Sequence, residues 1–320
     1  MLRSFMVRFR SLLNHPVYRQ NRLQVFGRAV AWTFHCVLRI PARAKFKRWN
    51  YTLYLPAKWR GGGCTAPYVF REHYEPELLL LEQFLEPGMV FVDGGANTGV
   101  FSFTAARMVG PEGHVFTFEP GSTCFHALER SKKLNGFNQI HLAQQALSDH
   151  SGTARLYHHL GQENAFTLGV DENAPYDEVS IVSLDEVAKQ QNLERVDFIK
   201  LDVEGAEELV LRGAQNVLKR WRPVVLFEIN LDAARRMKLA PDGACELLHS
   251  LGYELFSFDD NHDLVAAGEL PTQVANRFAI PSESPAMQLI GAGADRKAVG
   301  ADIHDSPLSR KNVELEAVST

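Results

Sequence analysis

Apolar positions in the middle of the chain, between residues 70 and 282, form short continuous runs separated by segments with helical periodicity. The short runs predict strands, and the periodic segments predict helices. Continuous apolar runs are typical of strands in a parallel sheet that helices cover on both faces. We therefore expect a doubly wound α/β domain with right-handed crossovers. The expected strands of its sheet are residues 89–93, 114–119, 140–146, 196–202 and 224–229.

Helices are expected before the first strand and after most of the others. Pro76 at the first turn and Pro87-Gly88 at the end delimit the helix that precedes the first strand. The other helical segments are bounded in similar ways, for example by Ser183 as a cap. The expected helices are residues 77–85, 100–108, 124–134, 184–190, 206–218 and 243–251. An inserted strand pair (154–158 and 178–182) and two final strands (253–258 and 277–280) complete the expected domain, residues 70–282.

Residues 1–60 differ from the rest of the chain in charge. They carry 13 of the 34 basic residues and no acidic residue. The remainder holds 21 basic and 38 acidic residues, a net charge of −17, so a basic arm precedes an acidic body. Within residues 1–48, basic and bulky apolar positions alternate, and Pro16 and Pro41 divide them into two predicted helices. Residues 50–57 alternate as a strand does.

The sequence supports two interpretations of this arm about equally. Basic amphipathic helices with aromatic anchors bind anionic membrane surfaces, which would place residues 1–48 at the inner face of the membrane. Alternatively, the apolar side packs on the body and the arginines face water. Nucleic acid is disfavoured as a partner, because no nucleic-acid-binding motif accompanies the charge. At the other end, residues 283–320 have few large apolar residues and no periodicity, which predicts a disordered tail.

The spacing of the cysteines and the lengths of the apolar runs indicate in which cellular compartment the protein is expected. The four cysteines form no CxxC pair and no zinc-ligand spacing. A chain of 320 residues needs no disulfide scaffold, so we expect a reducing, cytoplasmic environment. No run reaches the roughly 20 apolar residues that span a bilayer.

The first predicted strand ends in Asp93, and Gly94, Gly95 and Gly99 follow before the next helix. Glycine permits positive φ and close approach to a ligand. A dinucleotide site would need G-x-G-x-x-G here, which the sequence lacks. An acid in this turn repels a pyrophosphate but suits S-adenosylmethionine, which is cationic and carries no phosphate. Glu119 follows Gly99 by 20 residues, about the spacing at which an acid reaches ribose hydroxyls.

Five sequence blocks occur in order, and through them residues 88–282 resemble the FkbM-type methyltransferases. The blocks are FVDGGANTGVFS from Phe91, FTFEP from Phe116, ALSD from Ala146, DFIKLDVEGAE from Asp197 and VLFEIN from Val225. The resemblance implies a Rossmann-like methyltransferase sheet, mostly parallel with an antiparallel last strand. It also implies an S-adenosylmethionine-dependent O-methyltransferase that acts on a hydroxyl of a sugar, glycan, glycolipid or natural product. Gly94 departs from the family, which commonly has a larger apolar residue there.

The resemblance further implies which residues contact the cofactor, and these come from three of the blocks. They are Asp93, Gly95, Asn97 and Gly99 at the methionine end, Glu119 at the ribose, and Ala146, Leu147 and Ser148 at the adenine.

Methyl transfer to an alcohol needs a base for the hydroxyl proton. Asp202 is the first candidate because it ends the fourth strand, and Glu204 and Glu228 are the others. These three acids could instead bind a divalent cation, but we favour a metal-free site. A different class of function is a catalytically silent nucleotide-binding or scaffold protein that kept the fold. The acids at the strand ends favour the enzyme.

Overall fold

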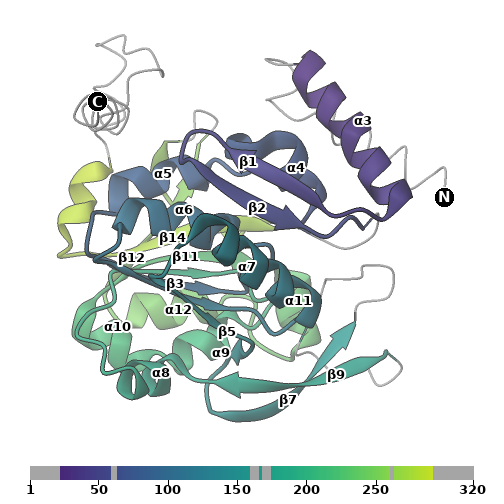
Figure 1. Cartoon of the computed structure of the whole chain (residues 1–320). Helices are drawn as coiled ribbons and strands as arrows, with labels where there is room; N and C mark the ends of the chain where they lie inside the picture. The colour runs from purple at the N-terminus through teal and green to yellow at the C-terminus, as the bar shows by residue number, and fades with distance from the viewer. Residues whose placement is uncertain (1–21, 59–62, 159–165, 168–173, 260–262, 291–320) are drawn as a thin grey trace.

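The computed structural model describes residues 22–58, 63–158, 166–167, 174–259 and 263–290. An eight-stranded sheet lies at its centre, with helices on both faces (Figure 1). The strand order is β13-β12-β14-β11-β10-β3-β4-β5. The strands are β3 (Val90–Gly94), β4 (His114–Phe118), β5 (Ile140–Ala143), β10 (Phe198–Leu201), β11 (Val224–Ile229), β12 (Tyr253–Phe258), β13 (Leu264–Ala266) and β14 (Ala275–Pro281).

Strand directions in this sheet agree with the predicted doubly wound fold. The strands β11, β10, β3, β4 and β5 pair in parallel in that order. β14 runs antiparallel to both of its neighbours, β11 and β12. The predicted mostly parallel sheet with an antiparallel last strand is therefore confirmed. The edge strand β13 was not predicted, because three residues are too few to show a period.

Side chains of the central strands alternate between two apolar cores, one on each face of the sheet. In β10, Phe198 belongs to one core, whereas Ile199 and Leu201 belong to the other. This alternation follows from the pleat of a strand. One face is covered by α5 (Glu77–Phe84), α6 (Val100–Val109) and α7 (Ser122–Asn135), and the other by α8 (Leu184–Gln190), α9 (Glu207–Arg212), α10 (Gln215–Trp221) and α12 (Gly243–Ser250).

The predicted helix 206–218 is in fact two helices, α9 and α10, and Gly213 lies between them. A Cβ atom on Gly213 would lie 2.1 Å from the carbonyl oxygen of Ser148, so the chain passes very close to its neighbour there. The apolar period continues across the break, which is why the sequence did not reveal it. A further helix, α11 (Leu231–Arg236), follows β11, and the Asn230 side chain caps it by accepting from the Ala233 amide.

The predicted strand 140–146 also divides. Its first part is β5, whereas its last residue, Ala146, begins β6 of a second, four-stranded sheet with the order β6-β9-β7-β8. The predicted inserted strand pair is confirmed, because β7 and β9 pair antiparallel within this sheet. The strands are β6 (Ala146–Leu147), β7 (Gly152–His158), β8 (Phe166–Thr167) and β9 (Tyr176–Val182).

The N-terminal region contains a helix and a β-hairpin. α3 (Arg22–Leu38) matches the second of the two predicted helices, and the first lies outside the described residues. Residues 42–48 are not helical, however, because β1 (Ala42–Phe46) pairs with the predicted strand β2 (Tyr51–Leu55). Alternate burial along β1 explains this difference, since small and aromatic residues face inward between exposed cations. Short helices, α4 (Thr65–Phe70) and η1 (Arg71–His73), connect the hairpin to α5.

The C-terminal region holds more structure than its composition predicts. A 3₁₀ helix, η2 (Pro285–Leu289), lies within the expected tail, and Ser284 caps it by accepting from the Ala286 amide. Residues 291–320 of the predicted tail lie outside the described residues. None of the described helices has the length and apolar content that crossing a membrane requires.

Candidate active site

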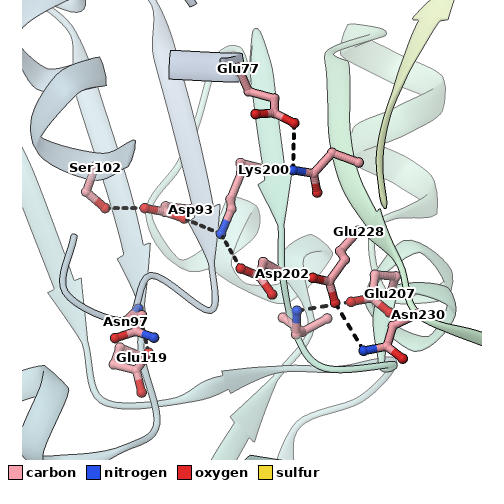
Figure 2. Close-up of polar contacts among 12 residues, drawn as sticks. Glu77, Asp93, Asn97, Ser102, Glu119, Lys200, Asp202, Glu207, Glu228 and Asn230 are labelled. Atoms are coloured by element: carbon pink, nitrogen blue, oxygen red, sulfur yellow. Dashed lines mark hydrogen bonds and ion pairs between the residues drawn. The ribbon is translucent and has the colours of Figure 1, made fainter. Parts of the chain in front are cut away.

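A cleft of about 660 Å³ lies at the carboxyl ends of β3, β4 and β10. Ligands of doubly wound sheets bind at this edge of the sheet. The cleft is lined by Gly95, Asn97, Glu119, Pro120, Cys124, Ala146, Leu147, Leu156, Asp202, Val203, Glu204 and Ala206. Figure 2 shows two of its acidic residues, Glu119 and Asp202, with polar residues around them.

The turn after β3 packs directly on the turn after β10, and Gly95 makes this possible. Its φ is +73°, and a Cβ atom there would lie 1.9 Å from the carbonyl oxygen of Asp202. Only glycine tolerates both conditions. The amides of Gly95 and Ala96 both donate to the carbonyl of Phe118, which ties the turn to β4. The two turns thereby form one continuous floor of the cleft.

Glu119 follows β4, and the fold fixes its carboxylate. The amide of Asn97 donates to one oxygen at 2.7 Å, and the amide of Gly121 donates to the other at 2.8 Å. Burial raises the pKa of Glu119 to about 7, against the lowering effect of the two amides. Each carboxylate oxygen keeps acceptor capacity for a ligand hydroxyl. Glu119 is therefore placed to bind a vicinal diol.

Lys200 lies in β10 between two acids of the site. Its Nζ atom is 3.4 Å from Asp202 and 3.8 Å from Asp93 (Figure 2). Burial alone would lower the pKa of Lys200, but Asp202, Asp93 and Glu75 together raise it above its usual value. Lys200 is thus a buried cation that couples β3 to the cleft.

Asp93 itself is fully buried behind the turn. The Ser102 hydroxyl donates to its Oδ2 atom at 2.5 Å, and burial raises its pKa despite the nearby Lys200. It does not line the cleft, so its direct contact with the methionine end stays a prediction. In this structure the carboxylate anchors α6 and β10 to the turn.

Two acids of the β10 block, Asp202 and Glu204, line the cleft together. Glu204 adopts a left-handed conformation with φ of +54°, and Gly205 follows at +98°. Such conformations in non-glycine residues persist where the surroundings enforce them, and they are frequent at functional sites. Burial and the neighbouring Asp202 raise the pKa of Glu204 to about 7, while Arg236 opposes them. Glu204 therefore exchanges protons near neutral pH.

Glu228 is the second-last residue of β11, and it lines a second, separate cavity of about 320 Å³. It shares this cavity with Glu207, Glu208 and Asn230, and the Asn230 amide lies 3.5 Å from its carboxylate. Burial, followed by the charges of Asp202, Glu204 and Glu207, raises the pKa of Glu228 to about 9. The third candidate acid is thus close enough to interact with the other two but lies in a neighbouring cavity.

The structure brings most of the predicted site residues into one cleft. Gly99 and Ser148, like Asp93 and Glu228, do not line it. Gly99 precedes α6 in a left-handed conformation against Leu128 and Phe103, and buried Ser148 precedes Asp149, to which its hydroxyl donates. The predicted residues that line the cleft are Gly95, Asn97, Glu119, Ala146, Leu147, Asp202 and Glu204.

Several residues of the cleft were not among the predictions. Leu156 reaches it from β7, so the inserted sheet supplies one wall. Cys124 enters from α7, and its Sγ atom lies 3.5 Å from the Asn97 side chain. The alternation in residues 154–158 predicted a strand that contains Leu156. It did not predict which face of that strand lies toward the cleft. Glu75, which precedes the five sequence blocks, was also not predicted. Its charge contributes to raising the pKa of Lys200.

Within the described part of the chain, no three His, Cys, Asp or Glu side chains are grouped so as to hold a metal ion. Asp202, Glu204 and Glu228 thus do not form a ready cation site there. The cleft does fit the predicted methyl donor. Glu119 suits the ribose diol, the apolar wall at Leu147 and Leu156 suits a purine ring, and the carboxylates at the β10 end suit an ammonium and a sulfonium.

Comparison with known proteins agrees with this geometry. Residues 93–255 match the methyltransferase FkbM domain. The methyltransferase sdnD of Sordaria araneosa is 30% identical over 226 residues, which cover 55% of this chain and 86% of the relative. The 31-O-demethyl-FK506 methyltransferase FkbM of Streptomyces tacrolimicus is 26% identical over 246 residues, covering 67% of this chain and 91% of the relative.

Among solved structures, the methyltransferase FkbM from Methylobacillus flagellatus KT is similar at a TM-score of 0.40 and 14% identity. The similarity covers 68% of this chain and 53% of that one. The family match spans half of the chain and contains the glycine turn, Glu119 and the acids after β10. The chain therefore belongs to the FkbM family of S-adenosylmethionine-dependent methyltransferases.

Proposed function

We propose that this protein transfers a methyl group from S-adenosylmethionine to a hydroxyl oxygen. The observation that carries the proposal is the position of Glu204, a carboxylate with a pKa of about 7, in the same cleft as Glu119. A base whose pKa lies near the working pH is suited to take a hydroxyl proton. The name of the relative from Streptomyces tacrolimicus also indicates an oxygen acceptor, at position 31 of its substrate.

The cofactor supplies an electrophilic methyl carbon when it is bound. The residues of the cleft hold the reacting groups in line, and orientation alone supplies a large part of the acceleration of such a displacement. We assign the ribose to Glu119, the adenine to the wall of Ala146, Leu147 and Leu156, and the methionine end to the turn of Gly95 and Asn97. These assignments place the reacting carbon toward the β10 end of the cleft.

Glu204 and Asp202 have different roles in this proposal. Asp202 is paired with Lys200, and this ion pair fixes the position of its carboxylate. Glu204 has a pKa near neutrality, so it accepts the proton that the acceptor hydroxyl releases as its oxygen bonds to the methyl carbon. We therefore prefer Glu204 to Asp202 as the base, although strand position alone favoured Asp202.

For the acceptor we propose a polyhydroxylated molecule, such as a sugar, glycan, glycolipid or hydroxylated natural product. The acidic second cavity adjoins the cleft through Gly205, which lies between Glu204 and Ala206. Carboxyl groups form hydrogen bonds with several hydroxyl groups at once, as acceptors when ionised and also as donors when protonated. Glu207, Glu208 and Glu228 are therefore placed to orient neighbouring hydroxyls of such an acceptor.

The compartment that we propose is the cytoplasm. All four cysteines are buried and free. Free thiols are the normal state of cysteine in a reducing compartment.

A binding experiment followed by a turnover experiment tests this function. Titration calorimetry with S-adenosylmethionine is expected to show binding at one site, and a labelled-methyl assay over glycan, glycolipid and polyketide panels is expected to label an ether that resists mild base. Label on nitrogen, or on a base-labile carboxyl ester, contradicts hydroxyl methylation. Binding without turnover on any panel favours the silent scaffold protein instead.

A further inference from the structure

The helix α3 exposes an apolar stripe at the outside of the molecule. Eleven large apolar side chains are exposed among the described residues, and seven of them lie between residues 23 and 40. Figure 1 shows α3 at the edge of the molecule, beside α4 and away from the central sheet. We call these seven the exposed stripe: Leu23, Phe26, Val30, Phe34, Val37, Leu38 and Ile40. Such concentration in one helix and the residues directly after it differs from the scattered apolar residues of an ordinary protein surface.

α3 has a second apolar stripe on its opposite face, and that one is covered. Val25, Trp32 and Cys36 are buried and recur at helical spacing. The Trp32 ring lies 5.0 Å from that of Tyr68 in α4, and its Nε1 atom donates to the Thr65 hydroxyl at 3.0 Å. The helix is therefore fixed to the body by one side. A helix that is apolar on both faces but packed on only one needs a partner for the other.

Cations lie at the two ends of the exposed stripe and on β1, which follows it in the chain, and no acidic residue is near the stripe in the sequence. Arg22 and Arg39 lie exposed at the two ends of α3, and Arg43 and Lys45 lie on the outer face of β1. The first acidic residue of the chain is Glu72. Apolar side chains that enter the acyl region, with cations that meet headgroup phosphates, match an anionic lipid surface. A second copy of the chain would instead bring the same cations together.

We propose that α3 and β1 form a docking surface for an anionic lipid bilayer, with α3 lying in the plane of the interface. The buried stripe holds the enzyme to the helix, and the exposed stripe holds the helix to the lipid. The helix is 17 residues long and carries arginine within it, so it lies on the bilayer and does not cross it. Docking of this kind is independent of which acceptor the cleft methylates.

The experiment uses the full chain and vesicles of two compositions, phosphatidylcholine alone and phosphatidylcholine with phosphatidylglycerol. In sedimentation, we expect binding to the mixed vesicles that weakens with salt, because exposed charges are screened. The triple variant Phe26→Ser, Phe34→Ser, Val37→Ser is expected to lower the partition coefficient at least about tenfold. The variant Arg43→Glu, Lys45→Glu is expected to lower it and to flatten its salt dependence.

A matched control variant changes exposed apolar residues elsewhere. Leu134→Ser with Val274→Ser is expected to leave vesicle binding unchanged, because these residues lie outside the docking surface. Circular dichroism establishes that each variant is folded. Failure of the parent chain to bind mixed vesicles, or full binding by the triple variant, overturns the proposal. So does a dimer in sedimentation velocity that the triple variant dissociates, because the stripe would then be a protein interface.

Discussion

Glu119 receives hydrogen bonds from two backbone amides, those of Asn97 and Gly121, one on each oxygen. In Glu119→Gln, the side-chain NH₂ group replaces one of the two acceptor oxygens. It then faces a backbone N–H, and that hydrogen bond is lost. A buried hydrogen-bonding group without a partner costs about 1–3 kcal/mol, so we expect the Kd for S-adenosylmethionine to rise roughly 10- to 100-fold. Titration calorimetry measures this change.

A matched control is Glu129→Gln, which removes the same charge from an exposed position on α7. It is expected to leave the Kd unchanged. An unaltered Kd in a folded Glu119→Gln protein would remove Glu119 from the donor site.

Because the pKa of Glu204 is about 7, we can predict how kcat depends on pH. A base works in its ionised form, so kcat is expected to rise with pH and to level off above about 7. Glu204→Gln is expected to lower kcat about 100-fold or more and to abolish this rise. Stopped methyl-transfer assays from pH 5.5 to about 9 give the profile.

Asp202→Asn distinguishes the two acids. If Glu204 is the base, this variant reduces kcat but keeps the rise with pH. If Asp202→Asn abolishes the rise and Glu204→Gln retains it, the assignment of the base is wrong.

Some site residues could be predicted from the sequence because strand ends fix their position. Glu119 and Asp202 directly follow apolar runs, so they had to meet at the carboxyl edge of the sheet. The burial of Asp93 could not be predicted in this way. It depends on the register that places Lys200 beside Asp93 on the neighbouring strand, and one sequence does not reveal cross-strand register.

At the scale of elements, the contact between the turn after β3 and the turn after β10 makes a prediction about Gly95. Alanine at this position would have to adopt a positive φ, and its Cβ atom would lie 1.9 Å from the carbonyl oxygen of Asp202. Gly136 has a similar φ, +66°, but open space around it. Gly136→Ala is expected to cost about 1 kcal/mol through backbone strain alone.

Gly95→Ala should cost at least about 2 kcal/mol more than its control, because the turns must separate. It should also weaken binding of S-adenosylmethionine. Urea unfolding of the two variants gives the difference, and equal losses would mean that the turns adjust without strain.

Helices and strands with a clear period were predicted well, and the failures have physical reasons. β11 and β12 begin and end where their apolar runs do. The hairpin strand β1 was missed because its basic and apolar alternation suits a helix face or a strand, and only its packing decides. The break between α9 and α10 depends on the approach of Ser148 to Gly213, a tertiary contact without a local signal.

At the scale of the whole molecule, the buried acids make stability depend on pH. Burial raises the pKa of Glu228 from 4.5 to about 9 in the folded protein. The folded state therefore holds a proton that the unfolded state has released, so stability falls as pH rises between these two values. The acids with pKa values of about 7, such as Glu119 and Glu207, add to this fall in its lower part.

Glu228→Gln mimics the protonated form and keeps an acceptor for Asn230. It is expected to raise the free energy of unfolding at pH 8 by at least about 1 kcal/mol, since each unit of pKa shift corresponds to about 1.4 kcal/mol. At pH 5 the change should be small. Urea unfolding at both pH values checks this, with exposed Glu254→Gln as control. A gain of equal size at both pH values would mean that charge is not the cause.

The place of β14 in the sheet bears on which fragment of this protein can exist by itself. The family match ends at residue 255, whereas β14 (Ala275–Pro281) comes later and lies between β11 and β12. The match also begins inside β3, after Val90, Phe91 and Val92. A fragment cut to residues 93–255 would lose β14 and the second half of β12, which leaves β11 with an unpaired edge, and such edges aggregate. The segment that identifies the enzyme is thus shorter than its folding unit, and residues from both sides of it must be synthesised before the cofactor cleft can form.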